Sequence, residues 1–153
     1  MALAVNQFAP DFALPSTSGK EFHLRQTWAD QGGILYFYPK NFTRQCSKEA
    51  CGFRDEFSFF NGLNITVVGI SQDTLQSHHK FKETYQLPFE LLSDQTGKVS
   101  KLYGARIPLV GMTKRITYLL DSEHRVAAAY ENLLGGEKHV REMVEALARQ
   151  QKR

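Results

Sequence analysis

Hydrophobic residues in this chain are concentrated in short runs that predict strands. Residues 33–38 (GILYFY) and 65–70 (ITVVGI) are mostly apolar without regular alternation, a pattern typical of strands buried on both faces of a sheet. Pro39 ends the first strand, because proline has no N–H to donate within a sheet. Further strands are expected at 12–15 and 21–24, which form an N-terminal β-hairpin, at 88–92, and at 115–120 and 126–130, which form an antiparallel pair.

Helical spacing is found between these strands. Phe53, Phe57 and Phe60 recur at i, i+4 and i+7, so they predict one helix that begins near Thr43 and closes at residues 61–62. Other helices are expected from Asp73 or Thr74 to about 85, over 97–103, and from 137 towards the C-terminus. Strands that alternate with helices predict an α/β fold, in which a central mixed sheet is flanked by helices.

The composition is that of a globular domain, with 42% apolar and 23% charged residues. No internal repeat, low-complexity segment or linker divides residues 1–153, which are therefore expected to form a single domain. The net charge is only +3, and basic residues are interleaved with acidic ones. A nucleic-acid partner is therefore not expected.

The sequence also bears on location. Its start, MALAVNQFAPDFALP, lacks the basic segment of a signal peptide, and no apolar run approaches the ~20 residues needed to span a bilayer. Association with a membrane is therefore not expected. Two cysteines are too few for a secreted disulfide scaffold, so a reducing compartment, the cytoplasm, is the expected location.

Both cysteines lie in the stretch YPKNFTRQCSKEAC, five residues apart at Cys46 and Cys51. A structural disulfide, a metal site and a reactive thiol pair would each explain them. On an intact helix five residues rotate the two positions apart and separate their Cα atoms by about 8.6 Å, whereas a disulfide needs roughly 7 Å or less. A permanent disulfide therefore conflicts with the helix that the aromatic spacing predicts.

A metal site lacks ligands. Structural zinc requires four ligands at short regular spacings, and none of the histidines forms a pair with such spacing. His78 and His79 are adjacent, so on a helix their side chains diverge by about 100°, and both are expected to be solvent-exposed. We therefore expect no metal.

A reactive thiol fits the neighbouring residues best. Cys46 follows the proposed cap Thr43 by three positions, so it lies where the helix dipole and the unpaired N–H groups favour a thiolate. Arg44 and Lys48 add positive charge, although both are also ordinary residues for a solvated face. Cys51, deeper in the helix, would then be the resolving thiol.

These residues coincide with a family pattern. FYPKNFTRQC resembles the peroxiredoxin motif Pro-x-x-x-Thr-x-x-Cys, with Pro39, Thr43 and Cys46 at the matching positions. The segments KEACGFRDEF, VVGIS-x-D, LPFELLSDQTGKVSKLYGA and RITYLLD follow in the order found in the peroxiredoxin Q, or bacterioferritin comigratory protein, subfamily. The resemblance runs from about Gln7 to the C-terminal segment.

The resemblance implies a thioredoxin-like fold and a peroxidase that reduces hydrogen peroxide and organic hydroperoxides without a cofactor. It makes Cys46 the peroxidatic cysteine, which becomes a sulfenic acid. Pro39 would shield the thiol from water, and Thr43 would hydrogen-bond the peroxide. The family's arginine falls on Arg115, and Glu49 would orient that arginine or would simply be a solvated glutamate.

The resemblance also implies a cycle of disulfide exchange. Cys51 would resolve the sulfenic acid as a Cys46–Cys51 disulfide, for which the first helical turns must unwind; Gly52, a weak helix former, would ease that step. Thioredoxin or a similar dithiol would reduce the disulfide, and the protein is expected to be a monomer. Arg44-Gln45 replaces the family's usual Pro-Gly, and the segment RIPLVGMTKR is shorter than in many relatives.

The sequence leaves two other functions open. A thiol-disulfide oxidoreductase would usually carry Cys-x-x-Cys, and Pro39 and Thr43 would then have no task. A redox sensor would oxidise Cys46 once without turnover.

Overall fold

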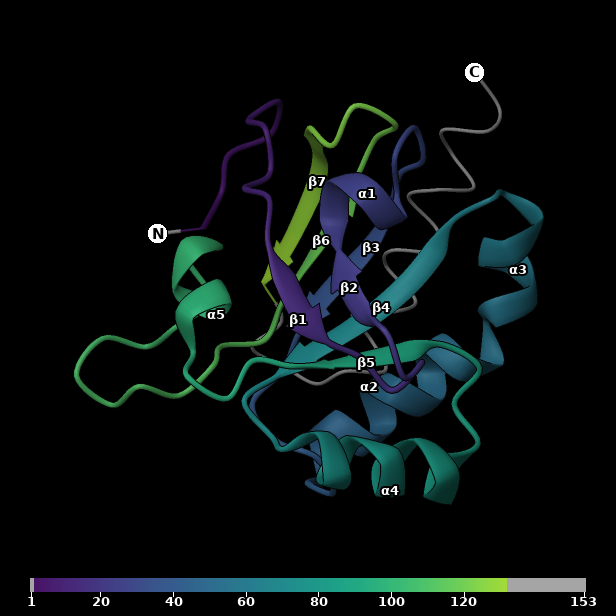
Figure 1. Cartoon of the computed structure of the whole chain (residues 1–153), viewed down its shortest axis with the longest axis vertical. Coiled ribbons are helices and arrows are strands. Elements are labelled where there is room, and N and C mark those ends of the chain that lie inside the picture. The colour runs from purple at the N-terminus through teal and green to yellow at the C-terminus, as the bar shows by residue number, and fades with distance from the viewer. Residues whose placement is uncertain (1, 132–153) are drawn as a thin grey trace.

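A five-stranded sheet lies at the centre of the computed structural model, which describes residues 2–131 (Figure 1). Its strands follow the order β5-β4-β3-β6-β7. Strands β3, β4 and β5 are parallel, whereas β6 runs antiparallel to β3 and β7 antiparallel to β6. The strand bounds are β3 (Gly33–Phe37), β4 (Thr66–Ser71), β5 (Glu90–Ser93), β6 (Ile116–Leu120) and β7 (Val126–Glu131). The sheet confirms the expected α/β fold, and the helix expected from 137 lies outside the described residues.

The N-terminal hairpin is also present. Strands β1 (Ala13–Pro15) and β2 (Glu21–His23) pair antiparallel, and a bridge from Ser16 to Leu92 joins the hairpin to β5. Leu24 was expected to end the second strand, but it begins a single helical turn, α1 (Leu24–Thr27), and is fully buried. The hairpin pattern could not distinguish these outcomes, because one buried leucine fits either a strand end or a helix start.

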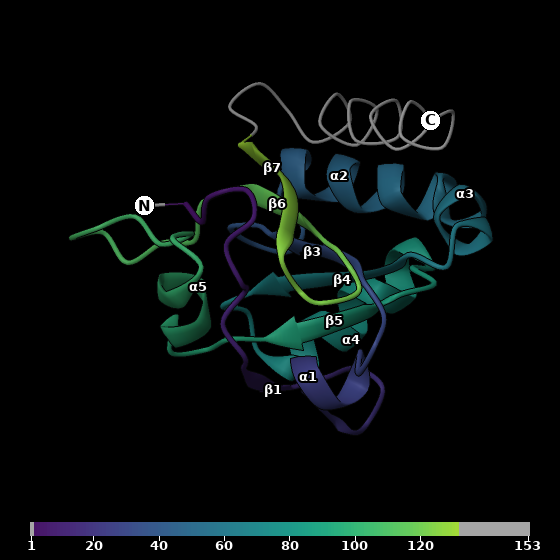
Figure 2. The ribbon, with the colours of Figure 1, turned by 90° about the horizontal axis from the view of Figure 1, so that it is seen from above.

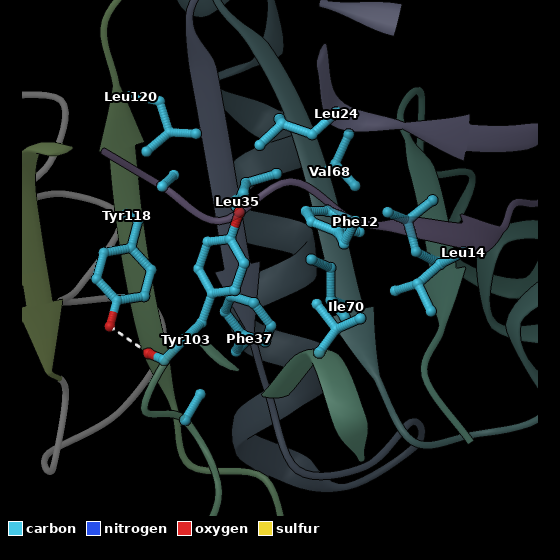
Figure 3. Packing of buried hydrophobic residues seen from close by; sticks show 14 of the residues in the cluster. Phe12, Leu14, Leu24, Leu35, Phe37, Val68, Ile70, Tyr103, Tyr118 and Leu120 are labelled. Atoms are coloured by element: carbon cyan, nitrogen blue, oxygen red, sulfur yellow. Dashed lines mark hydrogen bonds between the residues drawn. The ribbon is translucent and has the colours of Figure 1, made fainter. Parts of the chain in front are cut away.

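The sheet separates two hydrophobic cores. Alternate residues of β3 point to opposite faces, so Leu35 and Phe37 join one core while Ile34 and Tyr36 join the other. The first core lies under the hairpin and α5 (Lys98–Leu102), where Tyr118 donates a hydrogen bond to the Tyr103 carbonyl (Figure 3). The second core is covered by α2 (Arg44–Asp55), α3 (Phe57–Gly62) and α4 (Leu75–Tyr85). Figure 2 shows α2 and α3 on the side of the sheet opposite β1 and α1.

The prediction of one helix from Thr43 to residues 61–62 was wrong in one respect. Glu56 leaves helical geometry at φ −97° and ψ 8°, and this divides the segment into α2 and α3. In a straight helix the Cα atoms of Phe53 and Phe60 would be separated by about 10.5 Å along the axis. Their ring centroids lie 5.9 Å apart. Both rings belong to the second core, one on each side of the break.

The helix after β4 begins at one of the two residues that the sequence offered as its N-cap. Thr74 is the N-cap of α4, and its Oγ1 accepts a hydrogen bond from the Ser77 N–H at 3.1 Å. Asp73, the other candidate, instead uses its carboxylate to accept a hydrogen bond from Ser71 at 2.5 Å. The same oxygen, Oδ2, also accepts a hydrogen bond from the Asn41 backbone N–H at 3.0 Å.

Candidate active site

Helix α2 begins at the carboxyl end of β3, and a short loop joins them. The Tyr38 N–H still donates to the Ile70 carbonyl at 3.1 Å, after which half-buried Pro39 turns the chain away from the sheet. Phe42 adopts φ +66°, a left-handed conformation that is uncommon for a bulky residue, and Thr43 is the N-cap of α2. The loop therefore places the first turn of α2 at the carboxyl end of β3.

One face of α2 is buried against the sheet. Its buried residues are Cys46, Glu49, Ala50 and Phe53, spaced at i, i+3, i+4 and i+7. The Phe53 ring stacks on Tyr36 of β3, with centroids 4.6 Å apart and planes inclined by 26°. This packing fixes the rotation of α2, so the thiol of Cys46, a residue only 1% exposed, points towards the sheet.

Arg115 joins Cys46 and Glu49 into one cluster. The β3–β6 register pairs Phe37 with Ile116, so Arg115 lies beside the end of β3, where α2 begins. Its Nη2 donates to Cys46 Sγ at 3.2 Å, and its Nη1 donates to Glu49 Oε1 at 2.6 Å. The Glu49 side chain is fully buried and that of Arg115 is 11% exposed. The expectation that Glu49 orients the arginine therefore agrees with this geometry, and a solvated Glu49 does not.

The electrostatics of this cluster are governed by burial and by opposite charges. Burial lowers the pKa of Arg115, but Glu49 and Cys46 more than offset this effect, so its pKa lies above the ordinary value. The guanidinium thus stays charged next to the thiol. A cationic donor at hydrogen-bond distance stabilises a thiolate, which is the nucleophilic form of cysteine.

Thr43 occupies the expected capping position but makes a different bond. Its side chain accepts no hydrogen bond from the helix; instead, Oγ1 donates to the Lys40 carbonyl at 2.9 Å. The oxygen lone pairs of this exposed hydroxyl therefore remain available to a ligand that donates a hydrogen bond.

Cys51 lies on the same intact helix as Cys46, and both cysteines are free thiols. Cys51 is half-buried, and burial is the main reason why its pKa is raised, with Arg54 lowering it and Asp55 raising it. Helical geometry puts the two Cα atoms about 8.6 Å apart, beyond the reach of a disulfide. The structure therefore describes the reduced state.

Sequence reasoning missed a buried polar cluster beside this site. Asn41, two residues after Pro39, is 3% exposed and contacts His78, which is fully buried. The expectation that both adjacent histidines are solvent-exposed was thus wrong for His78, although His79 is exposed. The only sequence signal was the position of His78 three residues before buried Phe81, on the inward face of α4.

Two kinds of feature are absent from residues 2–131. Within this range, no three His, Cys, Asp or Glu side chains gather closely enough to hold a metal ion. No helix in the same range is long and apolar enough to cross a bilayer.

The sequence of this chain matches a known protein family. The sequence profile of the AhpC/TSA family matches residues 5–129, which is most of the chain. The chain therefore belongs to the AhpC/TSA family of peroxiredoxins, and its thiol-peroxidase class follows from that membership.

Individual relatives show which members of the family this chain resembles. The Coxiella burnetii peroxiredoxin bcp is 39% identical over 150 residues, which cover 94% of this chain and 98% of the relative. The chloroplastic peroxiredoxin Q of Arabidopsis thaliana is 40% identical over 142 residues, covering 92% of this chain but only 65% of the plant protein. The crystal structure of peroxidoxin BcpB from Mycobacterium tuberculosis superposes with a TM-score of 0.86 at 31% identity, covering 94% of this chain and 96% of that one. The chain is thus similar to the bacterioferritin comigratory protein and peroxiredoxin Q members.

Proposed function

We propose that this protein reduces hydrogen peroxide and organic hydroperoxides through Cys46, and that Cys51 resolves the oxidised thiol. The observation that carries the proposal is the contact of the Arg115 guanidinium with Cys46 Sγ at the first turn of α2. A buried thiol held by a cation and by the amino end of a helix is arranged to react as a thiolate.

In the first step, the Cys46 thiolate attacks one oxygen of the peroxide and the O–O bond breaks. Cys46 becomes a sulfenic acid, and the other oxygen leaves as water or an alcohol after it takes up a proton. Negative charge builds on the leaving oxygen during this step. Arg115 uses two of its five N–H donors on Cys46 and Glu49, so further donors can stabilise that charge.

The loop before α2 would orient the peroxide. Thr43 Oγ1 already donates to Lys40, so it would accept a hydrogen bond from the peroxide O–H. Half-buried Pro39 would exclude water from the thiol, because its ring offers no donor. Together, Thr43 and Arg115 would hold the two peroxide oxygens in line with Cys46, with the geometry that bond cleavage requires.

In the second step, the Cys51 thiolate attacks the sulfur of the Cys46 sulfenic acid and hydroxide leaves, which becomes water on protonation. The product is a Cys46–Cys51 disulfide, so the amino-terminal part of α2 must unwind to bring the sulfurs together. Half-buried Gly52, next to Cys51, lowers the cost of that rearrangement, because glycine is a weak helix former.

A dithiol closes the cycle by thiol–disulfide exchange and leaves as its own disulfide, and we propose thioredoxin or a similar protein as that donor. All electrons then come from thiols, so the reaction needs no cofactor. We further propose that residues 1–153 act as a single-domain monomer in the cytoplasm, where reducing conditions maintain the thiols.

Steady-state kinetics test the proposal. With thioredoxin and its reductase, the protein should turn over hydrogen peroxide, and Cys46→Ser should abolish turnover. Reduction of insulin disulfides in the absence of peroxide would indicate a thiol-disulfide oxidoreductase instead. A single stoichiometric oxidation of Cys46 without turnover would indicate a sensor.

A further inference from the structure

Asn41 lies at the centre of a buried polar cluster that links the active-site loop to α4. Its Oδ1 accepts from the Tyr38 hydroxyl at 2.6 Å, and its Nδ2 contacts Ser77 Oγ at 3.1 Å and His78 Nδ1 at 3.0 Å. Its backbone N–H donates to Asp73 Oδ2 at 3.0 Å. The side-chain amide therefore has a partner for its oxygen and for both N–H donors, all within the protein.

The contacts of Asn41 also define the tautomer of His78. The amide nitrogen of Asn41 faces His78 Nδ1, and an amide nitrogen can only donate. His78 Nδ1 must then accept, and Nε2, which faces Ser71 Oγ at 3.4 Å, carries the proton. A neutral imidazole of this tautomer completes the cluster, whereas a protonated Nδ1 would oppose the amide N–H.

The hydrogen bonds of Asn41 lie directly before a residue with a strained backbone conformation. Phe42 follows Asn41 and has φ +66°, and such a conformation persists in a bulky residue only where its surroundings fix it. The ring of Phe42 packs against that of Phe81, with centroids 5.1 Å apart. The backbone before Phe42 is held by the hydrogen bonds of Asn41. Thr43 and the first turn of α2 follow directly, so the position of Asn41 determines where that turn begins.

We propose that Asn41 and His78 are positioning residues for the oxidation of Cys46. His78 holds Asn41, and Asn41 holds the loop that carries Pro39 and Thr43 against the thiol. The inference rests on the proposed function, because it assigns these residues to the peroxide reaction of the same site. Neither residue touches the thiol; each acts through the geometry of the loop, where a displacement of about 1 Å can lower a rate by about a hundredfold.

The test measures Cys46 oxidation directly. In a Cys51→Ser background, hydrogen peroxide is mixed rapidly with the protein, the sulfenic acid is trapped with dimedone, and mass spectrometry gives the second-order rate constant. Asn41→Ala and His78→Leu should each lower this constant by about tenfold or more while the protein still unfolds cooperatively. His78→Asn places an amide oxygen near the position of Nδ1, so its rate constant should exceed that of His78→Leu several-fold.

His79→Gln is the matched control, since His79 is the exposed neighbour on the same helix, and its rate constant should stay within about twofold of the parent's. Folded Asn41→Ala protein that is oxidised at the parental rate overturns the inference, even if His78→Leu fails to fold. Failure of the proposed function is a separate outcome: the parent protein itself would form no sulfenic acid. Hydrogen exchange of the loop amides would then still test whether Asn41 holds the loop. Unchanged protection of these amides in Asn41→Ala would refute that role.

Discussion

The guanidinium of Arg115 lies 3.2 Å from the sulfur of Cys46, although the two residues are 69 positions apart in the chain. The antiparallel register of β3 and β6 and the rotation of α2 produce this contact jointly. Glu49, buried one turn after Cys46, holds the same guanidinium from its other side. A charged donor is thereby fixed beside the thiol before any substrate binds, which is the arrangement that electrostatic catalysis requires.

Replacing Arg115 by lysine keeps the charge but removes the planar fork that contacts Cys46 and Glu49 together. We expect Arg115→Lys to lower the rate constant of Cys46 oxidation by about 10²–10³-fold, the range found when one oxyanion donor is lost. Stopped-flow mixing with peroxide checks this value. Arg125→Lys, at an exposed arginine beyond β6, is the control, and equal rates in the two variants would contradict the role of Arg115.

The two phenylalanines at 53 and 57 should differ in their contribution to stability. Phe53 is 1% exposed and stacks on Tyr36, whereas Phe57 lies after the break at Glu56 and is only half-buried. Phe53→Ala should lower the free energy of unfolding by about 3–5 kcal/mol, as expected for a buried aromatic ring, and Phe57→Ala by clearly less. Urea titration measures both, and equal losses would contradict the described packing.

The buried imidazole of His78 should make stability depend on pH. Its pKa is lowered from 6.5 to about 4, first by burial, while Asp73 raises it and His79 lowers it. Between these two values the unfolded chain binds a proton that the native state does not bind, so the free energy of unfolding falls as the pH falls. The loss is complete near pH 4 and amounts to about 3 kcal/mol.

Urea denaturation at pH 7 and at pH 4.5 measures this dependence. The parent protein should lose about 2–3 kcal/mol more than His78→Asn between the two pH values, because the variant lacks the titrating group. His79→Gln should retain the parental loss. A His78→Asn variant with the full parental pH dependence would show that other groups cause it.

Oxidation should unwind only part of α2. Two contacts hold the helix beyond Cys51: the Phe53 ring stacks on Tyr36, and Arg54 Nη1 donates to the Tyr85 carbonyl at 2.8 Å. We therefore expect the rearrangement to end near Gly52. In hydrogen-exchange mass spectrometry, amides of residues 43–52 should lose protection in the disulfide form, while those of β3 keep it. A Cys46–Cys51 bond in a fully protected helix would contradict this account.

Sequence reasoning succeeded where a feature is local. The apolar run of β3 and the spacing of Pro39, Thr43 and Cys46 predicted the strand, the turn and the helix start that the structure contains. It failed where distant segments decide. The break at Glu56 depends on the core that α3 must reach, and no periodicity reveals it. The burial of His78 depends on Asn41, which lies 37 positions away, and adjacent histidines on a helix do not indicate which one faces inward.

Arg115 and Glu49 are an intermediate case. The family resemblance pointed to the arginine, but the sequence left a solvated Glu49 equally open. The β3–β6 register and the rotation of α2 together bring their side chains to 2.6 Å across 66 positions. The candidate residues could therefore be named from the motif and the resemblance, whereas their geometry required the fold.

The central claim is that Cys46 is oxidised by peroxide and Cys51 resolves it. Mass spectrometry after one equivalent of hydrogen peroxide tests this claim most directly, with the wild-type protein and Cys51→Ser treated in parallel. We predict an intramolecular Cys46–Cys51 disulfide in the wild type and a trapped sulfenic acid at Cys46 in the variant. A wild-type protein in which Cys46 stays reduced, or becomes oxidised without any bond to Cys51, would contradict the account.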